Sequence, residues 1–239
     1  MQDVCVDIPP EVLNAPTEDD LPYSDGMPME SIRHVLQTYL LMQPLIWLWR
    51  HRPTGFVAGD MFVYFSPDQV LTRDFRGPDV FVAKDGTKRS RKSWVVWQEG
   101  GKGPDVVIEL LSDSTARFDR TRKKDVYQDI LRVPEYILFD PYTAELEGYA
   151  LREGVYAPVE PEADGRLPCL VLDLSLRRWE GVYEGEHAVW LRWATADGEL
   201  VPTALELAEQ ERQEADLARD TSRAGRTGCG RRTAARRRP

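Results

Sequence analysis

Cysteine, histidine and long apolar runs are scarce in this chain of 239 residues, and each shortage excludes a class of protein. The three cysteines are odd in number and far apart, which excludes a disulfide scaffold and favours a reduced, cytoplasmic protein. The longest apolar run, residues 35–49, contains glutamine, threonine and proline, so it falls short of the roughly 18–20 clean residues of a membrane span. We therefore expect no transmembrane helix, and the opening residues predict no secretory leader.

Two common kinds of site are also missing. The three histidines are isolated and form no zinc-ligand spacing. No glycine-rich loop of the kind that cradles nucleotide phosphates is present. The acidic and basic residues are therefore the candidates for its chemistry.

The composition, 42% apolar and 30% charged, suits one compact domain of roughly 150–200 residues with tails. The net charge of −9 is unevenly divided, because residues 219–239 hold eight arginines and one aspartate, or +7, which leaves −16 on residues 1–218. An acidic body argues against a broad phosphate-binding surface. Nucleic acid, if bound, would be bound through local patches.

The chain divides into three segments. Residues 1–27 predict an extended lead-in, residues 28–200 a folded domain, and residues 201–239 a charged helix followed by a disordered, arginine-rich tail from residue 224. The helix, expected at residues 205–219, is either solvated or a weak coiled-coil contact. The arginines of the tail either contact nucleic acid or are simply solvated.

Hydrophobic periodicity predicts an α/β fold for the domain. A helix is expected from about Pro28 to a break near Pro44, with Ile32, Tyr39 and Leu40 among its inward-facing residues. A second helix is expected at residues 117–132, and an extra antiparallel layer between residue 141 and about residue 193. Strands are predicted at residues 56–57, 61–65, 80–83, 94–97, 106–111 and 135–139.

Two Pro-Asp pairs, at residues 78–79 and 104–105, each precede an apolar strand. The second strand contains Glu109 inside an otherwise almost continuous apolar run. A glutamate there is costly to bury as an ion unless it is paired or binds a metal. Glu109 is therefore the leading candidate for a functional carboxylate.

A partner for Glu109 is expected on a neighbouring strand. Asp105 is four residues away in the same strand, about 13 Å by strand rise, whereas ligands of one magnesium ion lie about 2.1 Å from it. Asp79, at the head of the earlier strand, is the better candidate, and the backbone carbonyl of Leu110 offers a third oxygen. Aspartate after proline is also a common turn former, which is the alternative for both aspartates.

Asp119, Lys123 and Tyr127 are spaced i, i+4 and i+8, so they share one face of the second helix. A lysine there would stabilise negative charge on a scissile phosphate beside a metal ion. The alternative is an exposed ion pair between Asp119 and Lys123.

The segment between residues 84 and 92 is the one local basic patch in the folded domain. It would grip a phosphate backbone, or it is a solvated hairpin loop. Its basic residues are Lys84, Lys88, Arg89, Arg91 and Lys92.

Between residues 59 and 151 the sequence resembles the Uma2 family, also called DUF820, which belongs to the PD-(D/E)XK, or restriction-endonuclease-like, superfamily. The resemblance is carried by Gly-Pro-Asp-Val-Phe-Val (77–82), Pro-Asp-Val-Val-Ile-Glu-Leu-Leu-Ser (104–112) and Val-Pro-Glu-Tyr-Ile-Leu-Phe-Asp-Pro (133–141). It extends over roughly residues 28–200. It implies a restriction-endonuclease-like α-β-β-β-α-β core, an endonuclease that hydrolyses DNA with Mg²⁺ or Mn²⁺, and a homodimer.

The resemblance also implies roles for individual residues. Asp79, Glu109 and the carbonyl of Leu110 would hold the metal ion. The superfamily lysine is expected two residues after Glu109, where this chain has a leucine, and Lys123 would take its place as the catalytic lysine. Glu30 matches an additional glutamate of some superfamily members, or is a solvated first-turn glutamate that favours the helix dipole. Asp105, Asp119 and Tyr127 are further accessory candidates.

The competing hypothesis is a module without catalytic activity. It would retain the nuclease-like fold, join subunits through the C-terminal helix, and contact nucleic acid through the arginine-rich tail.

Overall fold

The computed structural model describes residues 15–23, 31–67 and 75–229, with side chains described as far as Arg219. Residue contacts divide the chain into two units, residues 1–201 and residues 202–239. Within the described ranges, no helix combines the length and the apolar character that a membrane crossing requires.

A six-stranded mixed sheet forms the centre of the first unit, in the order β1-β4-β6-β7-β8-β9. Its only parallel pair is β6 with β7, and the other neighbours are antiparallel. The predicted α/β class and the order of helix, strands, helix and strand are therefore confirmed. The strands are β1 (Thr54–Gly59), β4 (Val80–Thr87), β6 (Val106–Leu110), β7 (Glu135–Phe139), β8 (Leu146–Arg152) and β9 (Val155–Pro158).

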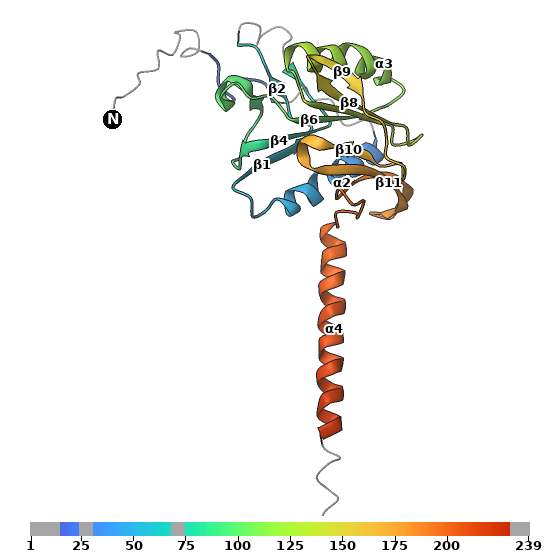
Figure 1. Ribbon diagram of the computed structural model, residues 1–239. Helices are drawn as coiled ribbons and strands as arrows, with labels where there is room; N and C mark the ends of the chain where they lie inside the picture. The colour runs from blue at the N-terminus through green and yellow to red at the C-terminus, as the bar shows by residue number, and fades with distance from the viewer. Residues whose placement is uncertain (1–14, 24–30, 68–74, 230–239) are drawn as a thin grey trace, which may run out of the picture. The chain divides into compact units, whose positions relative to one another are not determined.

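The two faces of this sheet are covered by different helices (Figure 1). Helix α2 (Ile32–Leu48) packs with Ile108 of β6 in one core cluster. The second helix runs through α3 (Ala116–Phe118), η2 (Asp119–Lys123) and η3 (Val126–Ile130), and its Tyr127 packs with Val107 in another cluster. Because successive strand residues point to opposite faces, β6 separates the two cores, and Glu109 faces the second helix.

Helix α2 differs from the prediction in two ways. It continues through Pro44 to Leu48, and Ile32 and Tyr39 are 66% and 47% exposed instead of facing inward. Gln37 takes an inward position because its side chain both donates to and accepts from the backbone of Leu191, at 2.9 Å in each case. A buried amide that is fully paired with a backbone costs little, and a hydrophobicity pattern cannot reveal such pairing.

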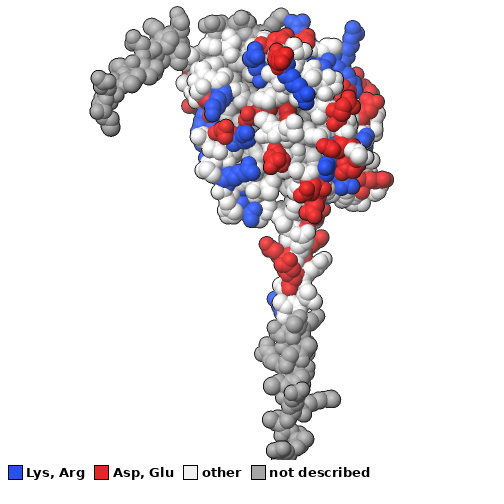
Figure 2. All heavy atoms as spheres, in the orientation of Figure 1, with Lys and Arg blue, Asp and Glu red and all other residues white. Residues whose placement is uncertain are grey.

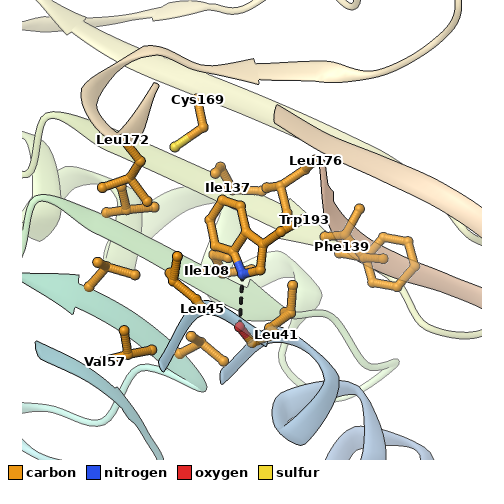
Figure 3. Packing of buried hydrophobic residues seen from close by; sticks show 14 of the residues in the cluster. Leu41, Leu45, Val57, Ile108, Ile137, Phe139, Cys169, Leu172, Leu176 and Trp193 are labelled. Carbon is orange, nitrogen blue, oxygen red and sulfur yellow. Dashed lines mark hydrogen bonds between the residues drawn. The ribbon is translucent and has the colours of Figure 1, made fainter. Parts of the chain in front are cut away.

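The expected antiparallel layer is present in its later part, as a three-stranded sheet of β10 (Leu167–Cys169), β11 (Leu174–Tyr183) and β12 (Glu186–Ala194), whereas β8 and β9 join the central sheet instead. It closes the core over α2. Figure 3 shows Trp193 among the residues of this core, and its indole nitrogen donates to the carbonyl oxygen of Leu41 at 2.8 Å.

Short elements complete the first unit. Strand β2 pairs with β3 in antiparallel and with β5 in parallel orientation. Two 3₁₀ turns connect longer elements. These elements are β2 (Val63–Tyr64), β3 (Phe75–Arg76), β5 (Trp94–Val95), η1 (Val96–Glu99) and η4 (Leu170–Leu172).

The second unit contains helix α4 (Ala204–Cys229). Thr203 and Glu206 form a reciprocal capping box, with N···O distances of 2.7 and 3.2 Å, which fixes where the helix begins. The helix extends beyond the predicted 205–219, as far as Cys229. Residues 230–239 lie outside the described part of the chain.

Candidate active site

Asp79 and Glu109 meet across the antiparallel pairing of β4 and β6. Val80 pairs with Ile108, which brings the residue before Val80 beside Glu109. The Oδ2 atom of Asp79 accepts a hydrogen bond from the backbone nitrogen of Leu110 at 2.7 Å. The backbone nitrogen of Asp79 donates to Oε2 of Glu109 at 3.4 Å. Each carboxylate thus accepts a hydrogen bond from the backbone of the neighbouring chain segment.

The second helix supplies two further groups to Glu109, whose side chain is fully buried. The ammonium of Lys123 lies 3.0 Å from Oε2, and the hydroxyl of Tyr127 donates to Oε1 at 2.9 Å. The same ammonium lies 2.8 Å from Oδ1 of Asp119. Asp79, Glu109, Asp119, Lys123 and Tyr127 therefore form one connected cluster, which we call the acidic cluster.

The acidic cluster contains three carboxyl groups and one ammonium. Burial raises the pKa of Asp79 to about 6 and the pKa of Glu109 to about 8. Burial also disfavours the charge on Lys123, but the adjacent Glu109 and Asp119 outweigh it and raise the pKa of Lys123 above its usual value. Charging every group would leave an excess of two negative charges, so the cluster favours protons or a cation.

The donor set suits a hard divalent cation. Within the described ranges, no three histidine, cysteine, aspartate or glutamate side chains form a metal cage by themselves. Magnesium is commonly held by only one or two carboxylates, with other oxygens completing its shell. Asp79, Glu109 and the carbonyl of Leu110 are all oxygen donors, and a divalent ion carries the two positive charges that the cluster lacks.

One residue that contacts the acidic cluster was missed by sequence reasoning. Tyr136 lies on β7, is fully buried, and donates from its hydroxyl to the backbone carbonyl of Asp119 at 3.0 Å. A tyrosine in a buried strand beside the Glu109 strand was the available signal, because a buried hydroxyl needs a hydrogen-bond partner.

A family model matches most of the chain. Residues 11–180 match the family model of Uma2, whose description reads "Putative restriction endonuclease". The chain belongs to the Uma2 family. This confirms the resemblance found in the sequence.

Two individual proteins are similar to this Uma2 chain. The "Uncharacterized protein sll1609" of Synechocystis sp. (strain ATCC 27184 / PCC 6803 / Kazusa) is 33% identical over 72 residues, which are 30% of this chain and 38% of that protein. The match thus spans well under half of that relative. A crystal structure described as "a putative nuclease belonging to DUF820", from Anabaena variabilis ATCC 29413, superposes with a TM-score of 0.44 at 16% identity, over 65% of this chain and 90% of that one.

One accessory candidate of the Uma2 chain, Asp105, is not part of the acidic cluster. Asp105 lies at the opposite end of β6 from Glu109, where its Oδ2 accepts from the backbone nitrogen of Lys84 at 2.6 Å. Its own nitrogen donates to the carbonyl of Val82 at 2.7 Å, so Asp105 extends the pairing of β4 and β6. Glu30 lies outside the described residues.

The basic segment at residues 84–92 is largely paired with protein groups. Arg89 and Arg91 both bind Glu99, at 2.8 and 2.7 Å, and the Arg91 side chain is fully buried. Arg89 also binds Glu18, Lys92 binds Asp19, Lys88 donates to the carbonyl of Trp49, and Lys84 donates to that of Val171. Much of the positive charge is neutralised, and Figure 2 shows basic side chains standing among acidic ones on the face in view.

Proposed function

We propose that this Uma2 protein is a divalent-metal-dependent endonuclease that hydrolyses phosphodiester bonds in DNA. Asp79, Glu109 and the carbonyl of Leu110 would hold Mg²⁺ or Mn²⁺. The observation that carries the proposal is the convergence of two carboxylates and a lysine from three separate elements into one buried, negatively unbalanced cluster.

The bound ion would stabilise negative charge developing on the phosphodiester and make water a better nucleophile at neutral pH. Lys123 keeps its proton because it faces two carboxylates, and its side chain is 17% exposed. It is therefore suited to approach a phosphate as a fixed positive charge. Tyr127 holds Oε1 of Glu109 and thereby directs Oε2 toward Asp79 and Lys123.

The choice of DNA as substrate follows from the family description as a restriction endonuclease. Residues 1–218 carry a net charge of −16, so long-range attraction of DNA by this part of the chain is weak. Binding would depend on the divalent ion and on local contacts. We expect activity to fall only gradually as the salt concentration rises, because each phosphate contact releases counterions and this chain offers few such contacts.

The test is cleavage of supercoiled plasmid by the purified full chain with Mg²⁺, with Mn²⁺ and with EDTA. Glu109→Gln should lose nicking, whereas Glu135→Gln, the same change at a second buried glutamate, should retain it. Equal nicking by wild type and Glu109→Gln would identify a contaminating nuclease. Binding of an oligonucleotide without cleavage in any metal would favour the non-catalytic module.

A further inference from the structure

The helix that carries Lys123 departs from regular α-helix where it faces Glu109. Residues Asp119–Lys123 and Val126–Ile130 are π-helical, separated by two residues of α-helix. A π-turn uses i→i+5 hydrogen bonds and is rare. Two such turns in one helix, both beside the acidic cluster, call for a physical reason.

The wider turn corrects an alignment problem. In an α-helix of 3.6 residues per turn, positions four apart are displaced by about 40° around the axis, so Asp119 and Tyr127 would diverge by about 80°. A π-turn contains more residues, so it reverses this displacement. Asp119, Lys123 and Tyr127 then face the same side of the helix. This allows Lys123 to contact both Asp119 and Glu109 while Tyr127 contacts Glu109.

Tyr136 contacts this helix at the start of its first π-helical segment. Its hydroxyl donates to the carbonyl oxygen of Asp119 at 3.0 Å, and its ring lies 5.1 Å from that of Tyr127. Strand β7, which carries Tyr136, pairs in register with the Glu109 strand. The hydroxyl therefore ties the helix directly to the sheet that holds the carboxylates.

We infer that Tyr136 is a positioning residue of the candidate active site: by holding the carbonyl of Asp119, it fixes the π-helical register that sets the Lys123 ammonium between Asp119 and Glu109. The inference rests on the proposed function for its catalytic consequence. Its structural part, the placement of Lys123, is independent of that function.

The test compares Tyr136→Phe with Tyr156→Phe. Tyr156 is a matched control because it is a buried tyrosine of the same hydrophobic core as Tyr136, and the two ring centroids lie 5.9 Å apart. Its hydroxyl also donates to a backbone carbonyl, that of Val133, at 2.9 Å. The first readout is the rate at which an acylating reagent modifies Lys123 in the full chain, followed by peptide mass spectrometry. Lys124, next on the helix and held over the ring of Tyr149, is the internal reference.

Tyr136→Phe should raise the acylation rate of Lys123 by about threefold to tenfold, the range for loss of one buried hydrogen bond, and leave Lys124 unchanged. Tyr156→Phe should change neither. The second readout, plasmid cleavage, should show kcat reduced about tenfold in Tyr136→Phe with KM little changed, because a misplaced catalytic group affects the chemical step.

Unchanged acylation of Lys123 in Tyr136→Phe would overturn the inference. An equal increase at Lys123 and Lys124, or the same increase in Tyr156→Phe, would also overturn it, because it would indicate general loosening of the fold. If Tyr136→Phe raises the acylation rate of Lys123 alone but the wild type cleaves no DNA, the positioning role of Tyr136 stands and the proposed function fails.

Discussion

Replacing Glu109 by glutamine should stabilise the protein when no metal is present, although the residue lies in the middle of the candidate active site. Burial raises the pKa of the Glu109 carboxyl from 4.5 to about 8. An acid whose pKa is raised by folding destabilises the folded state above its unfolded pKa. The wild type therefore loses stability as the pH rises from about 4.5 to about 8.

The structure sets the size of this effect. At pH 7 the penalty spans the interval from pH 4.5 to pH 7, which at about 1.4 kcal/mol per pH unit is about 3 kcal/mol. Glutamine removes this penalty but keeps only one acceptor oxygen for Lys123, and its amide then faces the Tyr127 hydroxyl. We therefore expect a net gain of about 1–3 kcal/mol, or about 2–12 °C in Tm.

The assay is thermal unfolding of wild type, Glu109→Gln and Glu135→Gln at pH 5 and pH 8, in EDTA and in Mn²⁺. In EDTA the advantage of Glu109→Gln should be larger at pH 8 than at pH 5. Mn²⁺ should raise the Tm of wild type and of Glu135→Gln but not of Glu109→Gln, since only a protein that binds the ion is stabilised by it. A Glu109→Gln protein that is less stable than wild type in EDTA at pH 8 would refute this reasoning.

Three further predictions follow from the packing. Gly59→Ala should destabilise the protein by about 1–3 kcal/mol in urea unfolding and weaken Mn²⁺ binding. The added Cβ would lie 2.5 Å from the sulfur of Met42 and 2.9 Å from the backbone carbonyl oxygen of Asp79. Gly103→Ala, whose Cβ would lie 3.4 Å from its nearest neighbour, should be nearly neutral. Lys123→Met should cost about 3–5 kcal/mol at pH 8 and less at pH 5, since it leaves two buried carboxylates unpaired. Deleting residues 220–239 should leave the main Tm unchanged in calorimetry.

The sequence was informative where one residue broke a local pattern. Glu109 interrupts an apolar strand, and the four-residue spacing of Asp119, Lys123 and Tyr127 places three polar groups on one helical face. Both features depend only on periodicities of 2 and about 4 residues, which are legible without a structure. The apolar runs likewise predict four strands of the central sheet, β1, β4, β6 and β7, but β8 and β9 lie in the stretch expected to form the extra layer.

Other features depend on contacts between distant segments, which local patterns do not contain. The ion pair between Arg89 and Glu18 joins residues 71 positions apart, and it neutralises part of the positive charge of the basic segment. Gln37 faces inward because of Leu191, 154 positions away. The π-helical register beside Glu109 is set by a hydroxyl on another strand, so the helix sequence alone predicts a regular α-helix.

The most direct test of a shared cation is anomalous diffraction from crystals grown with Mn²⁺. We predict one manganese peak within bonding distance of carboxylate oxygens from both Asp79 and Glu109, which disappears in Asp79→Asn. A peak bound elsewhere, or a cluster that holds no manganese at saturating concentration, would contradict the account.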